Sequence, residues 1–190
     1  PANSTNLYQF SAAAGQSFYF ARLSGSGGSF NDNWRLIDPY GNVPFNTVLS
    51  SDAGRLTLAA AGTYTLLVEG FVGDTGTGSY SLNVAPITDT TQALALGNVV
   101  NATLATPGQQ DRYTFNLPAN ALLYFDSLTN SDNLQWSLSG PPGAIVSNRA
   151  FSGSDGRNLN APVLALTAGA YTLTVAAPGQ VTGAYSFRLS

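Results

Sequence analysis

The sequence predicts an all-β protein made of two tandem β-sandwich, jelly-roll-like domains. A phrase of Gly, small residue, Tyr, hydroxyl residue and large apolar residue occurs four times, at 62–66, 78–82, 169–173 and 183–187. The glycine permits an unusual turn, and the alternation after it is typical of a half-buried strand. No segment of useful length has the periodicity of an amphipathic helix.

The phrases come in two pairs because the chain contains one unit written twice. Tyr-Gln-Phe at 8–10 matches Tyr-Thr-Phe at 113–115, and Phe-Tyr-Phe at 18–20 matches Leu-Tyr-Phe at 123–125. Nearly every predicted strand and turn has a partner in the same order. This order indicates a true internal repeat.

A short linker is expected between the repeats. Pro86 breaks a strand ladder and polar residues follow it. We therefore assign residues 1–86 to the first domain, 87–91 to the linker and 92–190 to the second domain.

Within the first domain, alternating or apolar runs bounded by turn residues predict short strands. The Gly/Ser-rich stretch 24–29 is expected to be a loop, and Asp-Pro-Tyr-Gly at 38–41 a turn with Pro at its second position. The run 64–69 is almost continuously apolar, which favours a central strand. Strands are expected near residues 7–10, 17–21, 33–37, 43–49, 56–58, 64–69 and 79–84.

One predicted strand of the second domain has no counterpart in the first. Val-Val-Asn-Ala-Thr-Leu at 99–104 predicts a first strand, whereas only residues 1–6 precede the matching hairpin of the first domain. The first domain is therefore expected to lack its first strand and to have an unpaired sheet edge, which invites pairing with another chain. Either the sequence is a piece of a longer array, or a neighbouring subunit donates the strand.

The composition excludes most catalytic chemistry. His, Cys and Lys are absent, so the chain has no Ser-His-Asp or Cys-His site, no usual zinc site and no Schiff-base lysine. Glu69 is the only Glu, and no two Asp residues stand out as a glycosidase pair. The net charge of −3 argues against nucleic-acid binding. We expect no enzymatic activity.

Calcium binding is the metal chemistry that the composition allows, because Ca²⁺ prefers oxygen ligands. Asp and Asn residues cluster at equivalent places of the two domains, although no stretch has the spacing of an EF-hand loop. The alternative is that these residues form turns by bonding their own backbone. The candidate ligands are Asp32, Asn33, Asp132, Asn133, Asp52 and Asp155, with Asn31 and Asn130 beside them.

The aromatic residues fall into two groups. Trp34 and Trp136 occupy equivalent strand positions, which favours core packing over a sugar-stacking platform. Tyr40 lies in a predicted turn and Phe71 at the edge of a predicted loop, so these two are the candidates for exposed ligand-binding aromatics. The four Tyr of the repeated phrase are expected to be core residues whose hydroxyls reach backbone partners, as in a tyrosine corner.

The chain resembles the bacterial pre-peptidase C-terminal domain. The resemblance rests on Asp-Arg-Tyr-Thr-Phe at 111–115, Trp-x-Leu at 136–138 before a Pro-Gly turn, Ala-Gly-x-Tyr-Thr-Leu at 168–173 and Gly-x-Tyr-Ser-Phe at 183–187. It implies small non-catalytic β-sandwiches that accompany secreted enzymes or occur in tandem in large exoproteins. Some members bind calcium, collagen or polysaccharide, but their clustered acidic ligands have no position-by-position match here.

We therefore expect a non-catalytic structural or adhesive repeat of a secreted or cell-surface bacterial protein, which assembles end to end into a fibre through strand-edge pairing. Its partners would be neighbouring repeats or copies of itself. The alternative is an accessory module of a secreted enzyme that binds extracellular polysaccharide or matrix protein. Neither hypothesis involves nucleic acid or insertion into a membrane.

Overall fold

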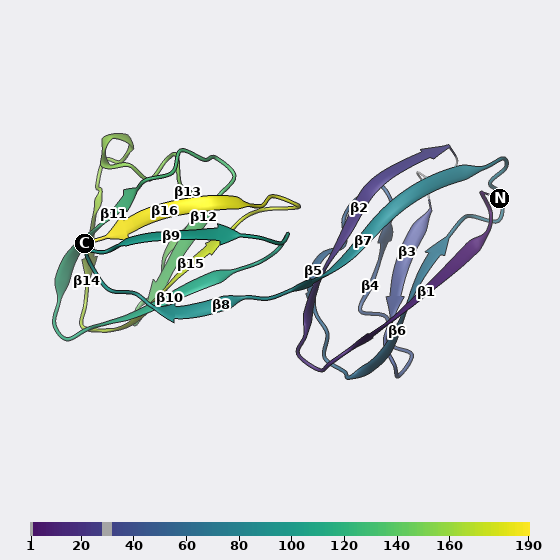
Figure 1. The fold of residues 1–190 in the computed structure, drawn as a ribbon, viewed down its shortest axis with the longest axis horizontal. Helices are drawn as coiled ribbons and strands as arrows, with labels where there is room; N and C mark the ends of the chain where they lie inside the picture. The colour runs from purple at the N-terminus through teal and green to yellow at the C-terminus, as the bar shows by residue number, and fades with distance from the viewer. Residues whose placement is uncertain (1, 28–31) are drawn as a thin grey trace. The chain divides into compact units, whose positions relative to one another are not determined.

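The computed structural model describes residues 2–27 and 32–190 (Figure 1). The chain divides into two compact units, Pro1–Ile87 and Thr88–Ser190. Strands dominate both, and the helical element in the described ranges is the single 3-10 turn η2 (Gly156–Asn158). No helix in these ranges has the length and apolar character needed to cross a membrane. The prediction of an all-β fold is confirmed.

The first unit is a sandwich of two antiparallel sheets, with strand orders β1-β6-β3-β4 and β5-β2-β7. Strands β1 and β7 lie at the ends of these sheets (Figure 1). The strands are β1 (Thr5–Ala12), β2 (Ser17–Gly27), β3 (Asn33–Ile37), β4 (Phe45–Val48), β5 (Gly54–Thr57), β6 (Gly62–Glu69) and β7 (Gly78–Ile87).

The core of this unit follows from alternation along its strands. In β6, Tyr64, Leu66 and Val68 are buried and the residues between them are partly exposed. They pack against Phe18 and Phe20 of β2 in the opposite sheet. Because β6 lies between β1 and β3, the prediction that it is a central strand is confirmed.

The second unit has sheets of order β13-β12-β15-β10-β8 and β14-β11-β16-β9. All its pairings are antiparallel except that of β8 with β10, which is parallel. The strands are β8 (Thr90–Ala93), β9 (Val99–Leu104), β10 (Asp111–Leu117), β11 (Ala121–Ser127), β12 (Gln135–Gly140), β13 (Gly143–Ala150), β14 (Val163–Leu166), β15 (Gly169–Ala176) and β16 (Gly183–Leu189).

Every strand of the first unit has a counterpart in the second unit, and the second unit has two further strands that precede these counterparts in the chain. Tyr8 lies opposite Leu66 and Tyr113 lies opposite Leu173, so β10 is the counterpart of β1. The same comparison matches β2 to β7 with β11 to β16 in order. Neither β8 nor β9 has a counterpart in the described part of the first unit. The expected absence of a first strand is thus confirmed for β9, and β8 is a second strand without a counterpart among the described residues of the first unit.

Two local predictions differ from the structure. Residues 24–27 are not a loop, because they extend β2 by pairing with residues 78–81 of β7; residues 28 and 29 of that stretch lie outside the described residues. The expected linker 87–91 is largely strand, since Ile87 ends β7 and Thr90 begins β8. In both cases pairing with a neighbouring strand outweighs a polar, turn-rich local sequence.

Candidate functional site: an open groove in the first unit

Three of the Asp residues considered as calcium ligands accept hydrogen bonds that hold parts of the fold together. The Asp52 carboxylate accepts hydrogen bonds from the Tyr19 hydroxyl at 2.9 Å and the Arg22 N–H at 2.8 Å. Asp155 caps η2, and Asp132 accepts a hydrogen bond from the Ser152 hydroxyl. Within the described ranges, no three His, Cys, Asp or Glu side chains lie close enough to hold a metal ion. Asp155 fits the turn-forming alternative, because it accepts a hydrogen bond from the nearby Arg157 N–H. Asp52 and Asp132 instead bond residues that are distant in the sequence.

Asp32 is different because it is buried, at 5% exposure. Its Oδ1 has no hydrogen-bond partner in the part of the chain that the structure describes. Burial raises the pKa of the Asp32 carboxyl, and the negative charge of Asp74 raises it further. A neighbouring candidate, Asn31, lies outside the described residues.

The expected match of residues 32–33 with 132–133 is wrong. The Leu49 N–H bonds to the carbonyl of Asp32, and the Phe151 N–H bonds in the same way to the carbonyl of Leu134. The counterpart of Asp32 is therefore Leu134, and that of Asn33 is Gln135, the first residue of β12. The second unit inserts residues just before its Trp-bearing strand, which displaces Asp132 and Asn133 from the equivalent place.

The two aromatics considered for ligand binding are strongly exposed, Tyr40 at 78% and Phe71 at 65%. They lie at opposite ends of one sheet. Tyr40 follows the end of β3 at which Ile37 pairs with Thr65, whereas Phe71 follows Glu69 at the other end of the same pairing. They therefore do not form one stacking platform. Trp34 and Trp136, by contrast, are fully buried, as expected.

The four Tyr of the repeated phrase divide into two kinds. The Tyr64 and Tyr171 hydroxyls donate to the backbone carbonyls of Ala60 and Thr167 at 2.9 and 2.7 Å, which confirms the tyrosine-corner prediction for these two. Tyr80 and Tyr185 instead bond to the side chains of a second tyrosine. Of the second kind, Tyr80 lines a groove in the first unit.

A groove of about 320 Å³ opens between β1 and β7 of the first unit. Tyr8 is 48% exposed there, and Phe10, Leu82 and Val84 are only partly buried although their side chains face the core. Its lining carries no charged side chain. The groove is lined by Tyr8, Gln9, Phe10, Leu66, Tyr80, Leu82 and Val84.

In the second unit the equivalent positions are covered. Tyr113 is 1% exposed and Phe187 and Leu189 are 0% exposed. The cover comes from the segment with β8 and β9, which contributes Leu94 and Leu104 to the core. The first unit therefore leaves open a surface that the second unit buries.

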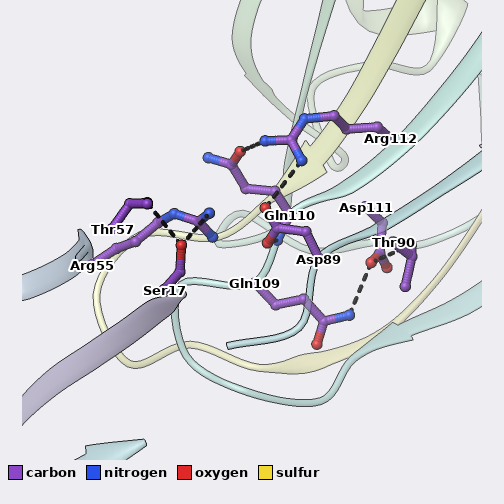
Figure 2. A network of polar contacts seen from close by, with 9 residues as sticks. All are labelled: Ser17, Arg55, Thr57, Asp89, Thr90, Gln109, Gln110, Asp111 and Arg112. Carbon is purple, nitrogen blue, oxygen red and sulfur yellow. Dashed lines mark hydrogen bonds and ion pairs between the residues drawn. The ribbon is translucent and has the colours of Figure 1, made fainter. Parts of the chain in front are cut away.

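Polar contacts hold the covering segment of the second unit (Figure 2). The Asp111 carboxylate, only 2% exposed, accepts hydrogen bonds from the Thr90 hydroxyl and the Gln109 amide, both at 2.8 Å. The Arg112 guanidinium bonds to Asp89 at 3.0 Å. Asp111 therefore fixes β8 and the turn before β10 to the sheet.

Asp111 also ends a chain of two phenols. The Tyr185 hydroxyl donates to it at 2.7 Å, so the Tyr113 hydroxyl, 2.7 Å from that of Tyr185, must be the donor in their bond. Burial raises the pKa of Tyr185, and the hydrogen bond to Asp111 adds to this rise. Tyr185 therefore stays protonated as a donor.

The first unit has the same series of side-chain hydrogen bonds, with the amide of Asn6 in place of the carboxylate of Asp111. The Asn6 amide donates to the Tyr80 hydroxyl at 2.8 Å, and that hydroxyl lies 2.9 Å from the hydroxyl of Tyr8. Burial raises the pKa of Tyr80, and the hydrogen bond with Tyr8 adds to the effect. The end of the groove is thus polar, and the buried Asp32 carboxyl lies close to Asn6 and Tyr80 behind it.

The sequence indicated an open edge but none of the residues that line the groove. The signal that could have found them is the repeat itself. Tyr8, Phe10, Tyr80 and Leu82 align with residues that the second domain would bury under the strand 99–104, which the first domain lacks.

No protein-family model matches the chain, and no curated protein matches it either. Among solved structures, it is similar to the pre-peptidase C-terminal domain of a collagenase from Bacillus anthracis, with 18% identity over 57% of this chain and 100% of that one and a TM-score of 0.37. It is also similar to the CUB1-EGF-CUB2 domains of human MASP-1/3, with 9% identity over 100% of this chain and 94% of that one and a TM-score of 0.30. The corresponding domains of rat MASP-1 give 8% identity over 99% and 92% and a TM-score of 0.31.

Proposed function

We propose that the chain is a non-catalytic structural and adhesive repeat of a secreted or cell-surface bacterial protein, joined to its neighbours through the strand edges of its first unit. The observation that carries this proposal is the groove between β1 and β7, with Phe10, Leu82 and Val84 left partly exposed. Unpaired edge strands beside apolar side chains are a template for pairing with another chain.

The side-chain chemistry supports a role without catalysis. The chain has no His, Cys or Lys, and its one Glu, Glu69, is paired with Arg35 at 2.6 Å. Two further Arg side chains are paired with Asp, Arg112 with Asp89 and Arg188 with Asp126. Such a surface suits a neutral spacer better than a site that needs free charged groups.

A second candidate function is binding of polysaccharide or matrix protein as an accessory module. The strong exposure of Tyr40 and Phe71 favours it, because exposed aromatics stack on sugars and anchor protein interfaces. Since the two lie at opposite ends of a sheet, each would contact ligand separately. The motifs shared with pre-peptidase C-terminal domains support an extracellular location for either function.

Electron microscopy of the native material tests the proposal. Filaments or oligomers with a repeat close to the length of two units are the expected result. Native material that is monomeric, together with binding of a specific glycan that is lost in Tyr40→Ala, would favour the accessory module instead.

A further inference from the structure

In the second unit, β9 covers the surface that is equivalent to the groove of the first unit. Because the strands of the two units correspond, the pairing of β9 predicts how an occupant would lie in that groove. Strand β9 runs antiparallel to β16, with Val100 opposite Phe187 and Ala102 opposite Tyr185. Because β7 is the counterpart of β16, the same places on β7 are Leu82 and Tyr80. An occupant in this register would have apolar residues at alternate positions, facing the groove.

The backbone gives a second, independent requirement. In the second unit β9 bonds to the outer edge of β16 and β8 bonds to the outer edge of β10. Among the described residues, the corresponding edges of β7 and β1 end the two sheets of the first unit. An occupant therefore has to be extended polypeptide, since a sugar or a lipid chain cannot supply a ladder of amide hydrogen bonds.

The charge of the groove lining restricts the kind of segment that can bind there. The groove is lined without charged side chains, and at its polar end Asn6 stands where the second unit has Asp111. The buried Asp32 lies beside Asn6 and Tyr80 but outside this lining. The segment that covers the second unit, residues 88–104, has Asp89 as its only charged residue. A neutral segment fits such a lining without burying an unpaired charge.

We propose that the groove between β1 and β7 binds a neutral, extended β-segment of another polypeptide chain, antiparallel to β7 and with apolar residues at alternate positions. This inference rests on the proposed function, for which it names the chemistry of the partner. A second copy of these 190 residues is a poor donor. Its own segment of this kind is already seated, with Leu94 8% and Leu104 1% exposed.

A synthetic peptide with the sequence of residues 88–104 is the probe, added to the full 190-residue chain. We expect saturable binding by fluorescence anisotropy and at least tenfold slower amide hydrogen exchange in β7 and β1. A control peptide with Leu94→Asn, Val100→Asn and Leu104→Asn should not bind. Protection in β16 instead of β7 would mean exchange into the second unit and would overturn the proposal.

Two variants on one strand locate the site. Val84→Asp places a charge in the groove and should weaken peptide binding at least tenfold, whereas Asn83→Asp, on the exposed face of β7, should leave it unchanged. Circular dichroism checks that both variants fold, and hydrogen exchange of wild type provides the readout if Val84→Asp does not. Equal binding by both folded variants contradicts the proposal.

Further outcomes separate this inference from the proposed function. If the chain alone dimerises through β7 and the peptide dissociates the dimer, the occupant is a second copy and the inference fails. Filaments in the native material without peptide binding at β7 would also overturn the inference, while the proposed function stands. Peptide binding together with monomeric native material would support the inference and contradict end-to-end assembly.

Discussion

The hydroxyl oxygens of Tyr8 and Tyr80 lie 2.9 Å apart in the first unit, and those of their counterparts Tyr113 and Tyr185 lie 2.7 Å apart in the second. The pairs have the same geometry but different surroundings, because Tyr8 is 48% exposed and Tyr113 is 1% exposed. One chain therefore contains an open and a covered version of the same site. Equivalent substitutions in the two units measure what the cover contributes.

The first comparison removes one hydroxyl from each tyrosine pair, that of Tyr185 in the second unit and that of Tyr80 in the first. Tyr185→Phe takes a donor from the buried Asp111 carboxylate and should destabilise the second unit by about 1–3 kcal/mol. Tyr80→Phe removes a hydroxyl from a partly exposed site and should cost less than about 0.5 kcal/mol. Urea unfolding followed by hydrogen exchange assigns each loss to its unit. Equal losses of unfolding free energy in the two variants would contradict the prediction that the cover makes the hydroxyl of Tyr185 more important for stability than that of Tyr80.

The two core tryptophans allow a second comparison. The Trp136 indole N–H donates to the Ser154 hydroxyl at 2.7 Å, whereas the Trp34 indole nitrogen is buried and has no partner within the described residues. Replacement by Phe creates a similar cavity in each unit, but only Trp136→Phe also breaks a hydrogen bond. Trp136→Phe should therefore destabilise its unit by about 1 kcal/mol more than Trp34→Phe does. The reverse order in urea unfolding would show that the Trp34 site is satisfied by other means.

Asp32 carries a prediction with a definite dependence on pH. Its folded-state pKa is raised, so between the unfolded and folded pKa values the folded state holds more protons, and stability falls as pH rises through that window. Asp32→Asn removes the buried charge and should stabilise the first unit by about 1 kcal/mol at pH 7. The gain should vanish at a pH below the unfolded pKa of about 3.9.

Thermal unfolding at pH 3 and pH 7, with a chelator present, checks this. Asp38 is the control with the opposite sign, because the hydrogen bond from the Asn42 side chain and those from backbone N–H groups lower its pKa. That contribution is present above the unfolded pKa and is lost as pH falls through the folded one, so Asp38→Asn should destabilise at pH 7. If calcium raises the wild-type Tm and has no effect on Asp32→Asn, then Asp32 is a calcium ligand and the stabilisation prediction is wrong.

The sandwich fold was predictable because its signals are local and occur twice. The alternation at Tyr64, Leu66 and Val68 identifies a buried strand from a few residues. The same alternation recurs at 171–175, where the equivalent strand of the second unit lies. The absent first strand was predictable for the same reason, since an internal repeat shows which part has no partner. The prediction that the Tyr hydroxyls of the repeated phrase bond the backbone is confirmed for Tyr64 and Tyr171, whose partner carbonyls lie four residues away. It is wrong for Tyr80 and Tyr185, which bond side chains that are distant in the sequence.

The features that escaped prediction depend on contacts between distant segments. Strand β8, Thr-Thr-Gln-Ala, has no apolar alternation, and it is a strand because it pairs with β10 about twenty residues later. Ser24 to Gly27 resemble a loop but pair with β7. Asp32 was matched with Asp132 because the residues inserted before Trp136 can be placed on either side of Asp132 and Asn133 in a sequence alignment. The strand register places the insertion before Leu134, which is therefore the counterpart of Asp32.

The glycine that opens the repeated phrase carries the last prediction. Gly169 has a φ of +143°, and a Cβ built on it would lie 2.5 Å from Cγ of Pro141. Gly179 also has a positive φ, of +57°, but a Cβ there would meet nothing within 4 Å. Gly179→Ala should therefore cost about 1 kcal/mol, because its φ lies in the left-handed helical region that L residues adopt with modest strain. Gly169→Ala combines a φ outside that region with steric overlap and should cost about 3 kcal/mol or more.

The double variant Gly169→Ala with Pro141→Ala separates the two contributions at Gly169. Because it removes the ring that the new methyl group would strike, it should be less destabilised than the sum of the two single variants. Gly62 provides the same test in the first unit, where a Cβ would lie 2.8 Å from Cγ of Pro39. If Gly169→Ala and Gly179→Ala give equal losses in urea unfolding, the close approach of proline does not constrain this position. The glycine of the phrase would then be required for its backbone conformation alone.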